Sequence, residues 1–246
     1  MFQGFYDLAS NMITQNRIMN VISNNMANVS TPGFKSDRML ERTFKEELLY
    51  RYDSQGKTQV GTVSRMNVAD SKVTNYEAGT LQETQRALDV ALTGNGFFVV
   101  QSEDGNVYSR NGSFNLDNEG YLVQQGVGRV LGTNGPIRLN TDEIAIDNQG
   151  NITSADGLQY FGRLQVVDFA DYNQLNKTTG GVFTSDAQPQ AVANPQMKHK
   201  CVESSNVSMV EEMTAMMSGQ RALQSSSQVL KMYDQLMGKA VQTGTL

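Results

Sequence analysis

Both ends of this 246-residue chain carry the spacing of long helices that pack along one stripe. Near the N-terminus, steps of three and four join Phe5, Leu8, Met12, Gln15, Met19, Ile22, Met26 and Val29. Near the C-terminus, a repeat of seven joins Met209, Met216, Leu223, Leu230 and Met237. A repeat averaging about 3.5 residues keeps one stripe of a helix against a partner helix over many turns. Chain ends are usually the least ordered part of a domain. A chain with its best packing surfaces there is expected to join other chains.

The terminal stripes favour an interface between several chains over a closed pair within one chain. A Met-rich stripe is most often ordinary core packing, and two terminal helices could simply pair with each other. Polar residues share these stripes, however, namely Gln15 at one end and Gln220, Ser227 and Asp234 beside the other. The predicted assembly interface comprises Leu8, Met12, Met19, Ile22, Met26, Met209, Met213, Met216, Leu223, Leu230 and Met237.

Composition changes sharply along the chain and predicts an α+β fold. Ten of the 13 Met lie in residues 1–29 or 202–246, whereas 15 of the 22 Gly lie in residues 75–190. Met suits helix packing, and Gly between β-branched runs suits turns. We therefore expect N- and C-terminal helices that form a coiled-coil-like bundle, with a central all-β domain. The expected domains are a terminal helical assembly domain (1–36 and 202–246), a connecting segment (37–75) and a β-domain with a linker (76–201).

Local signals set the expected element boundaries. The first helix is expected over about 4–28, where Ser30-Thr31-Pro32-Gly33 ends it. The last helix is expected to run to about residue 240, with Ser208 and Glu211 in capping-box spacing at its start. A charged, amphipathic second helix is expected over 37–52, followed by extended structure to 75.

Short strands are expected between residues 76 and 190. The main candidates are 89–92, 96–101, 107–114, 121–124, 129–131, 136–139 and 162–170. Asn111-Gly112 and Asn134-Gly135 are turn signals, because both residue types tolerate positive φ. The sequences LDNEGYL (116–122) and IDNQGNI (146–152) resemble each other and predict one hairpin used twice, with Asp-Asn-X-Gly as its turn.

Charge and hydropathy exclude several classes of protein. The net charge is −5 and no Lys/Arg cluster is present, which argues against a nucleic-acid partner. No apolar run approaches the roughly 18 residues of a membrane span, so no membrane insertion is expected. The start lacks a basic and apolar signal sequence, and these features alone would predict the cytoplasm. One Cys excludes an intramolecular disulfide.

No catalytic, cofactor or metal site is predicted. His199 and Cys201 could form a base and a nucleophile, but their polar segment carries no oxyanion signal. A zinc site needs four ligands, typically Cys or His, and the chain has one of each. The loop that begins at Asn115 resembles the start of a calcium loop, but its twelfth position is Gly126 instead of Glu. A hairpin turn is the favoured interpretation of that loop.

Three blocks of sequence resemble the bacterial flagellar rod and hook proteins. The segment ISNNMANVSTPGFK (22–35) is similar to the N-terminal signature of that family, and residues 203–237 are similar to its C-terminal block. The segments 87–101, 108–123 and 130–139 resemble its central β-region. The signature positions carried over are Asn24, Asn25, Asn28, Thr31, Pro32, Gly33, Asn206, Glu211, Glu212, Gln220 and Arg221. Arg86-Ala87 departs from the family, since many members have a pair such as Asn-Pro there.

The resemblance implies a structural subunit of the flagellar basal-body rod, without enzymatic activity or cofactor. It implies terminal helices that order on assembly around a central channel, and a β-domain that faces outward. The implied partners are copies of the chain, other rod and hook proteins, and the flagellar type III export apparatus. The implied location is the basal body, outside the cytoplasm, which overrides the cytoplasmic expectation. A protein of either the proximal or the distal rod fits this resemblance. The first ten residues, MFQGFYDLAS, and the length of the chain favour the proximal side.

Three alternatives remain at this point, and one of them, an enzyme, is disfavoured because the sequence shows no cluster of acid, base and nucleophile. A hook or other axial component would share the terminal helices, but the large insertion of a hook protein is missing. A β-domain binding module on a coiled-coil stalk is the alternative from a different class, and it should carry a cleaved signal or an anchor.

Overall fold

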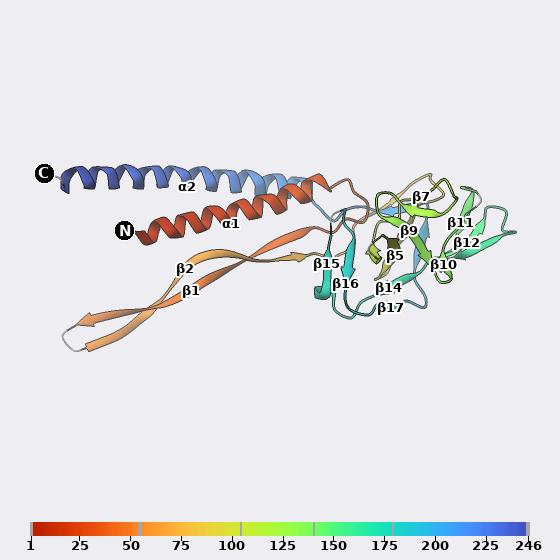
Figure 1. Cartoon of the computed structure of the whole chain (residues 1–246), viewed down its shortest axis with the longest axis horizontal. Helices are drawn as coiled ribbons and strands as arrows, with labels where there is room; N and C mark the ends of the chain where they lie inside the picture. Colours follow the sequence, from red (N-terminus) through yellow and green to blue (C-terminus); the bar gives the residue numbers. More distant parts are fainter. Residues whose placement is uncertain (1, 54–55, 104, 140, 179, 245–246) are drawn as a thin grey trace. The chain divides into compact units, whose positions relative to one another are not determined.

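The chain folds into two compact units. The computed structural model describes residues 2–53, 56–103, 105–139, 141–178 and 180–244. We call Met1–Ala27, Asp37–Asn75 and Ser208–Leu246 the helical unit, and Asn28–Ser36 and Tyr76–Val207 the β-unit. The fold is α+β, as predicted, with an N-terminal helix, a central β-rich region and a C-terminal helix (Figure 1).

The elements of the described residues have the following bounds. The helical unit contains α1 (Phe2–Ala27), β1 (Asp37–Asp53), β2 (Gly56–Thr74) and α2 (Met209–Gly244). The first half of the β-unit contains β3 (Leu81–Glu83), β4 (Val90–Leu92), β5 (Phe97–Ser102), β6 (Gly105–Ser109), β7 (Phe114–Leu116), β8 (Leu122–Gln124), β9 (Gly128–Gly132) and β10 (Gly135–Pro136). Its second half contains β11 (Ile144–Ile146), β12 (Asn151–Ser154), β13 (Tyr160–Arg163), β14 (Val166–Asp168), a 3₁₀ turn (Tyr172–Gln174), β15 (Leu175–Lys177), β16 (Phe183–Ser185), β17 (Gln190–Ala191), β18 (Met197–His199) and β19 (Cys201–Glu203).

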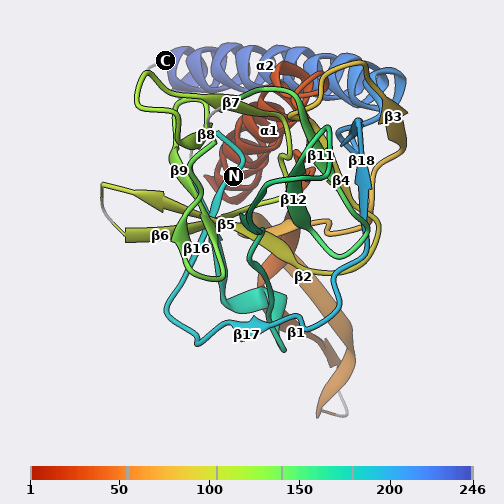
Figure 2. The same cartoon turned by 90° about the vertical axis from the view of Figure 1, so that its right-hand side faces the viewer.

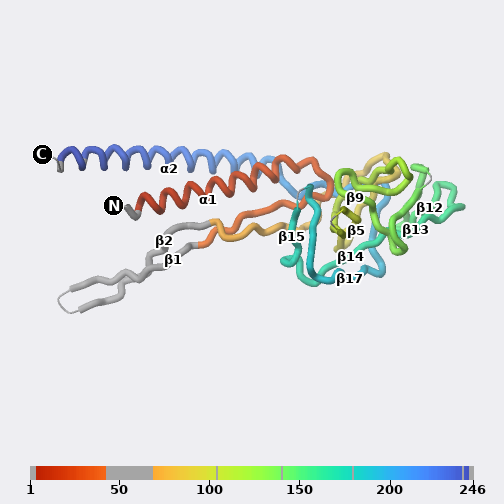
Figure 3. The backbone as a smooth tube through the Cα atoms, in the orientation of Figure 1, coloured from red at the N-terminus to blue at the C-terminus, as the bar shows by residue number. Residues whose placement is uncertain are grey.

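In the helical unit, α1 and α2 lie antiparallel and side by side (Figures 1 and 3). A Cβ on Gly4 would lie 3.0 Å from the Tyr233 hydroxyl, and one on Gly219 would lie 3.4 Å from Met19 Cγ. Residues near the start of α1 therefore lie beside residues near the end of α2, and residues later in α1 lie beside residues earlier in α2. Small residues at these crossings let the two backbones approach closely.

The face that α2 turns inward follows a heptad pattern. Most of its half-buried or buried positions belong to one series that steps by four and three: Glu212, Met216, Gly219, Leu223, Ser226, Leu230, Tyr233 and Met237. Ala222, Ser227 and Val229 lie next to this series and are also half-buried. On α1, Ile22 is buried, and Leu8, Met12, Met19 and Met26 are half-buried. Most of the predicted stripe thus lies between the two helices. Met209 and Met213 do not, since both lie at the exposed start of α2. An intermolecular coiled coil remains a prediction.

The helix expected over 37–52 is wrong. This segment is strand β1, which pairs antiparallel with β2 from Asp37↔Thr74 to Asp53↔Gly56 (Figure 1). The Leu, Glu, Lys and Arg of the segment favour a helix by intrinsic propensity, but pairing with a partner strand overrides propensity. The Asn25 side chain also donates a hydrogen bond to the backbone carbonyl of Asp37. In a helix, this carbonyl would accept from the backbone N–H four residues later.

Antiparallel strands build the β-unit (Figure 2). The largest sheet has the order β15-β16-β6-β5-β9-β8-β7, with β10 added to β9, β14 to β5 and β17 to β14. Two apolar clusters lie against it. One surrounds Phe98, Phe114 and Ile152, and the other surrounds Phe97 and Phe183.

Most predicted strands are present, with shifted or interrupted bounds. The segment 107–114 is split into β6 and β7, and 162–170 is split into β13 and β14. Asn134-Gly135 lies in the β9–β10 hairpin, as predicted. Gly112 instead marks a crossing of two segments, because a Cβ there would lie 1.6 Å from the Val90 carbonyl oxygen.

The repeated hairpin is confirmed. Leu116 pairs with Leu122 in β7–β8, and Ile146 pairs with Ile152 in β11–β12, with the same register. In each turn one aspartate Oδ1 accepts two backbone N–H groups: Asp117 accepts from Glu119 and Tyr121 at 2.9 and 2.8 Å. Asp147 Oδ1 accepts from the backbone N–H groups of Gln149 and Asn151, at 2.9 Å each. Each turn is therefore held by one aspartate oxygen that accepts both N–H groups.

Acid should weaken the β-unit through Asp117. The hydrogen bond from the Tyr121 backbone is the largest cause that holds the pKa of Asp117 below its ordinary value. A carboxyl with a lowered folded pKa stabilises the fold above its unfolded pKa of about 3.9, and this stabilisation is lost as the pH falls through the folded pKa. Urea unfolding of the wild type between pH 7 and about pH 2.5 should show this loss, and Asp117→Asn should show less of it. Equal pH dependence in both proteins would contradict the prediction.

Candidate assembly site

Asn25 joins three elements of the helical unit. Its carboxamide nitrogen donates to the backbone carbonyl of Asp37 at 2.8 Å and to Glu212 Oε1 at 2.8 Å. Its oxygen accepts from the Asp37 backbone N–H at 3.0 Å, and the residue is only 1% exposed. One amide thus fixes the end of α1, the start of β1 and the first turn of α2. This arrangement explains two signature positions, Asn25 and Glu212.

Asp37 closes the base of the hairpin. Its Oδ1 accepts from the Thr74 hydroxyl at 2.7 Å, and its Oδ2 lies 3.3 Å from Lys72 Nζ. The carboxylate is buried, so these two partners offset much of its desolvation. Asp37 could not be singled out from the sequence, because an aspartate that follows a helix-breaking segment gives no sign of what will surround it.

In the β-unit, a buried ion pair holds the segment that follows α1. Lys35 Nζ lies 2.5 Å from Glu203 Oε1 and donates to the Glu77 carbonyl at 2.8 Å, and both side chains of the pair are 1% exposed. The Gly79 N–H donates to Glu203 Oε1 at 3.0 Å. Arg110 Nη1 lies 3.6 Å from the other carboxylate oxygen, Glu203 Oε2. Burial lowers the pKa of Lys35, while the hydrogen bond and charge of Glu203 oppose that shift.

Two further contacts fix the same segment. Lys177 Nζ donates to the Lys35 carbonyl and lies 3.7 Å from the centre of the Phe34 ring. Gly33 has φ 68°, and a Cβ there would lie 2.4 Å from the Arg110 carbonyl carbon. Glycine is therefore required at position 33 for both conformation and space.

Asn206 plays a comparable part at the other end of the β-unit. Its Oδ1 accepts from the Ser36 N–H at 2.7 Å, and its Nδ2 donates to the Glu77 carbonyl at 3.1 Å. Its own N–H donates to the Phe34 carbonyl at 3.4 Å. A single residue thereby ties the segment before α2 to the segment after α1.

The other signature residues make fewer of the contacts described here. The Thr31 hydroxyl donates to Asn28 Oδ1 at 3.3 Å, and the Thr31 N–H donates to the Asn28 backbone carbonyl at 3.1 Å. These two hydrogen bonds form the turn after α1. Pro32 follows in that turn and is half-buried. Exposed positions in α1 and α2 hold Asn24, Glu211, Gln220 and Arg221. The Glu211 N–H lies 3.5 Å from Ser208 Oγ, at the expected helix start.

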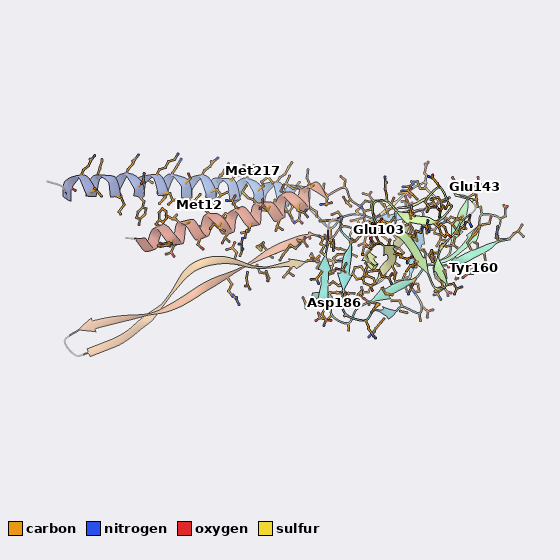
Figure 4. All side chains as sticks on the ribbon, in the orientation of Figure 1. Met12, Glu103, Glu143, Tyr160, Asp186 and Met217 are labelled. Carbon is orange, nitrogen blue, oxygen red and sulfur yellow. The ribbon has the colours of Figure 1, made fainter. Side chains whose placement is uncertain are left out.

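The helical unit also exposes apolar surface that the predicted stripes did not include. On α2, Val210 and Met217 are 75% and 53% exposed, and on α1, Tyr6 and Ile13 are 61% and 57% exposed. Figure 4 shows Met12 on the side of α1 towards α2, and Met217 on the side of α2 away from α1. A second helical stripe on each helix could have indicated these residues from sequence.

The residues weighed for chemistry are part of the β-structure. His199 Nε2 lies 2.7 Å from the Ala87 carbonyl, and Cys201 is buried in β19. Within the described part of the chain, His, Cys, Asp and Glu side chains do not gather in a group of three that could hold a metal ion. Neither helix in the described ranges is long and apolar enough to cross a membrane.

Three family models match the chain. They are "Flagella basal body rod protein" over residues 5–35, "Flagellar hook protein FlgE/F/G D1 domain" over 91–163, and "Flagellar basal body rod FlgEFG protein C-terminal" over 200–243. The first and last of these contain Asn25 and Asn206, which organise the two networks described above.

Curated relatives match over nearly the whole chain. The flagellar basal-body rod protein FlgG of Bacillus subtilis is 31% identical over 260 residues, with 98% of each chain covered. FlgG of Buchnera aphidicola subsp. Schizaphis graminum is 34% identical over 251 residues, with 91% of this chain and 93% of the relative covered. FlgF of Caulobacter vibrioides is 29% identical over 238 residues, with 95% and 94% covered.

Asn25→Ala should loosen the base of the β1–β2 hairpin, whereas Asn24→Ala should not. Removing the buried carboxamide leaves the backbone groups of Asp37 without this partner, at a cost of about 1–3 kcal/mol. Hydrogen exchange of a peptide covering residues 36–42 should then be faster by about tenfold or more. Asn24 is the control because it is the adjacent, exposed asparagine. Equal exchange in the two variants would contradict the assigned role of Asn25.

Lys35→Met should destabilise the β-unit strongly. The substitution leaves Glu203 buried without its nearest cation, and breaking a buried pair in this way costs about 3–5 kcal/mol. Lys198→Met is the matched control, because Lys198 pairs with Glu83 at 2.8 Å on the exposed surface. Such surface pairs contribute little. Urea unfolding measures both variants, and similar small losses would show that the buried pair does not stabilise the unit.

Proposed function

We propose that this chain, which belongs to the flagellar basal-body rod protein family and is a structural subunit of the rod, polymerises through its terminal helices into the axial drive shaft. The family resemblance seen in the sequence is confirmed by the relatives at 31% and 34% identity. This family is a structural one and not an enzyme family. Its members are basal-body components, so the chain is placed at the flagellar basal body.

The observation that carries the proposed polymerisation is the two-sided character of α2. One side packs on α1 through Met216, Leu223 and Leu230, and another side exposes Val210 and Met217. An amphipathic helix that needs one partner shows one apolar stripe. A helix with apolar groups on two sides has room for a second partner. We propose copies of this chain and other rod and hook proteins as those partners.

The remaining features of assembly follow from the family and are proposed on that ground. The terminal helices stay loose during export through the flagellar type III apparatus, and they order against neighbouring subunits at the growing end. Ordering at that moment keeps subunits apart until they meet. The rod then transmits torque through many interlocked helices, including an intermolecular coiled coil. In this proposal the predicted interface, from Leu8 to Met26 and from Met209 to Met237, mostly holds α1 and α2 of one subunit together, and the exposed sides of the two helices meet the neighbouring subunits.

A second axial role is favoured by one observation. The model matched over residues 91–163 is described as the D1 domain of hook as well as rod proteins. A hook or other axial component would use the same terminal helices, and the relatives named as rod proteins favour the rod. Relatives named as the rod proteins FlgG and FlgF both match. For the position along the rod we propose either the proximal or the distal part, with the proximal side favoured by the start of the sequence and the chain length.

Leu223→Asp should block incorporation into the rod and leave the β-unit folded. Leu223 lies in the middle of the inward face of α2, and burying a carboxylate there costs several kcal/mol. In cells that lack the wild-type gene, the amount of the variant in purified basal bodies should fall by about tenfold or more. Ser225→Asp, two residues on, exposed and turned roughly 80° from Met217, is the control. A normal amount of Leu223→Asp in basal bodies would refute the role of this stripe.

A further inference from the structure

We propose that Asn134, at the tip of the β9–β10 hairpin, is a site of spontaneous deamidation that converts the asparagine into isoaspartate and aspartate. The chain contains three Asn-Gly pairs, which begin at Asn95, Asn111 and Asn134. A glycine after asparagine favours this reaction, because it has no side chain to hinder attack by its own backbone nitrogen. The inference is independent of the proposed polymerisation, since the hairpin lies within the β-unit.

The reaction needs only the chain itself and water. The backbone nitrogen of Gly135 attacks Cγ of the Asn134 side chain, and the new N–C bond closes a succinimide ring. The attacking nitrogen loses its proton, and the carboxamide nitrogen leaves as ammonia. Water then opens the ring: cleavage at Cγ gives aspartate, and cleavage at the backbone carbonyl carbon gives isoaspartate. Both products carry a new negative charge, and isoaspartate also lengthens the backbone by a methylene group.

The surroundings of Asn134 leave room for the ring. Its side chain is exposed and, within the described residues, takes no part in a hydrogen bond. Gly135 has φ 114°, and a Cβ built on it would have no atom within 4 Å other than those of its chain neighbours. The side chain of Asn134 can therefore turn towards the Gly135 nitrogen without meeting another segment.

The end of this hairpin is also held by few hydrogen bonds. Strand β10 consists of Gly135 and Pro136 and pairs with the end of β9. Pro136 has no N–H to donate, and the Ile137 N–H beyond it reaches the Val130 carbonyl at 3.3 Å. Local opening costs least where an element ends in few backbone bonds. The turn at Asn134 can therefore reach the ring-forming conformation without unfolding of the sheet.

The pair that begins at Asn111 is fixed in place. The Oδ1 of Asn111 accepts a hydrogen bond from the Ser113 N–H at 2.9 Å. Gly112 is buried, and a Cβ on it would lie 1.6 Å from the Val90 carbonyl oxygen. The backbone here crosses another segment too closely to rearrange, so the reaction should be slow at this pair.

The pair that begins at Asn95 isolates the effect of the attacking nitrogen. Asn95 is exposed, as Asn134 is, but Gly96 is buried. A Cβ on Gly96 would lie 2.8 Å from Val166 Cγ1 and 3.0 Å from the Val167 carbonyl oxygen. Strand β5 follows directly and pairs with β6, β9 and β14. Turning the Gly96 nitrogen towards its asparagine would disturb this sheet, whereas the Gly135 nitrogen is free of such neighbours.

Peptide mapping of the aged protein tests the proposal. Trypsin separates the three Asn-Gly pairs into the peptides 87–110, 111–129 and 130–138. The last peptide contains one Asn and no Gln, so any conversion of amide to acid in it occurs at Asn134. After incubation of the folded full-length chain at neutral pH, its deamidated fraction should exceed that of either other peptide by about tenfold. Electron-transfer fragmentation distinguishes isoaspartate from aspartate, and a sample that was not incubated gives the background.

Two controls show whether the fold selects the site. In urea the three pairs lie in an unfolded chain, and their deamidated fractions should become similar. Asn134→Gln should abolish the acid product in peptide 130–138, because glutamine would have to close a larger ring.

Three results for the folded protein would each overturn the inference. They are equal fractions in the three peptides, a larger fraction at Asn95 or Asn111, and no deamidation above background in any of them. These results would leave the proposed polymerisation untouched, because the measurement uses the unassembled chain.

Discussion

The ion pair between Lys35 and Glu203 is the constraint on which the arrangement of the β-unit around the signature segment depends. A buried pair is costly unless its remaining polar atoms are satisfied. Here Lys35 also donates to the Glu77 carbonyl and Glu203 Oε1 also accepts from the Gly79 N–H. Glu203 Oε2 accepts no hydrogen bond within the described residues and lies 3.6 Å from Arg110. The pair fixes residues 28–36 within the β-unit, although helical-unit segments precede and follow them in the chain.

Two asparagines act as substitutes for regular secondary structure where the chain changes direction. Asn25 bonds both backbone groups of Asp37, as a neighbouring strand would, and Asn206 bonds Ser36 and Glu77 in a similar way. A carboxamide offers both a donor and an acceptor, which aspartate does not at neutral pH. This property gives a physical reason for asparagine at two signature positions.

The structure could be predicted from the sequence where it depends on interactions between residues that are close together in the chain. The terminal helices follow from apolar periodicity, and the repeated Asp-Asn-X-Gly turns follow from local hydrogen bonding, because both effects act within a few residues. Prediction from the sequence failed where distant segments decide the outcome. The β1 segment has helix-favouring residues, and only its pairing with β2 makes it a strand. The contact of Lys35 with Glu203 joins residues 168 positions apart. The exposed Val210 and Met217 of α2 were not included in the predicted interface, because the seven-residue repeat was counted on one face only.

The arrangement of α1 explains why a single copy leaves apolar surface exposed. This helix packs against α2 on one side and against the β1–β2 hairpin on the other, so it is the middle layer of the helical unit. On these two helices, Val210, Met217, Tyr6 and Ile13 stay more than half exposed. The polymerisation proposed above would bury these side chains, and the free energy gained by doing so is roughly proportional to the apolar area removed from water.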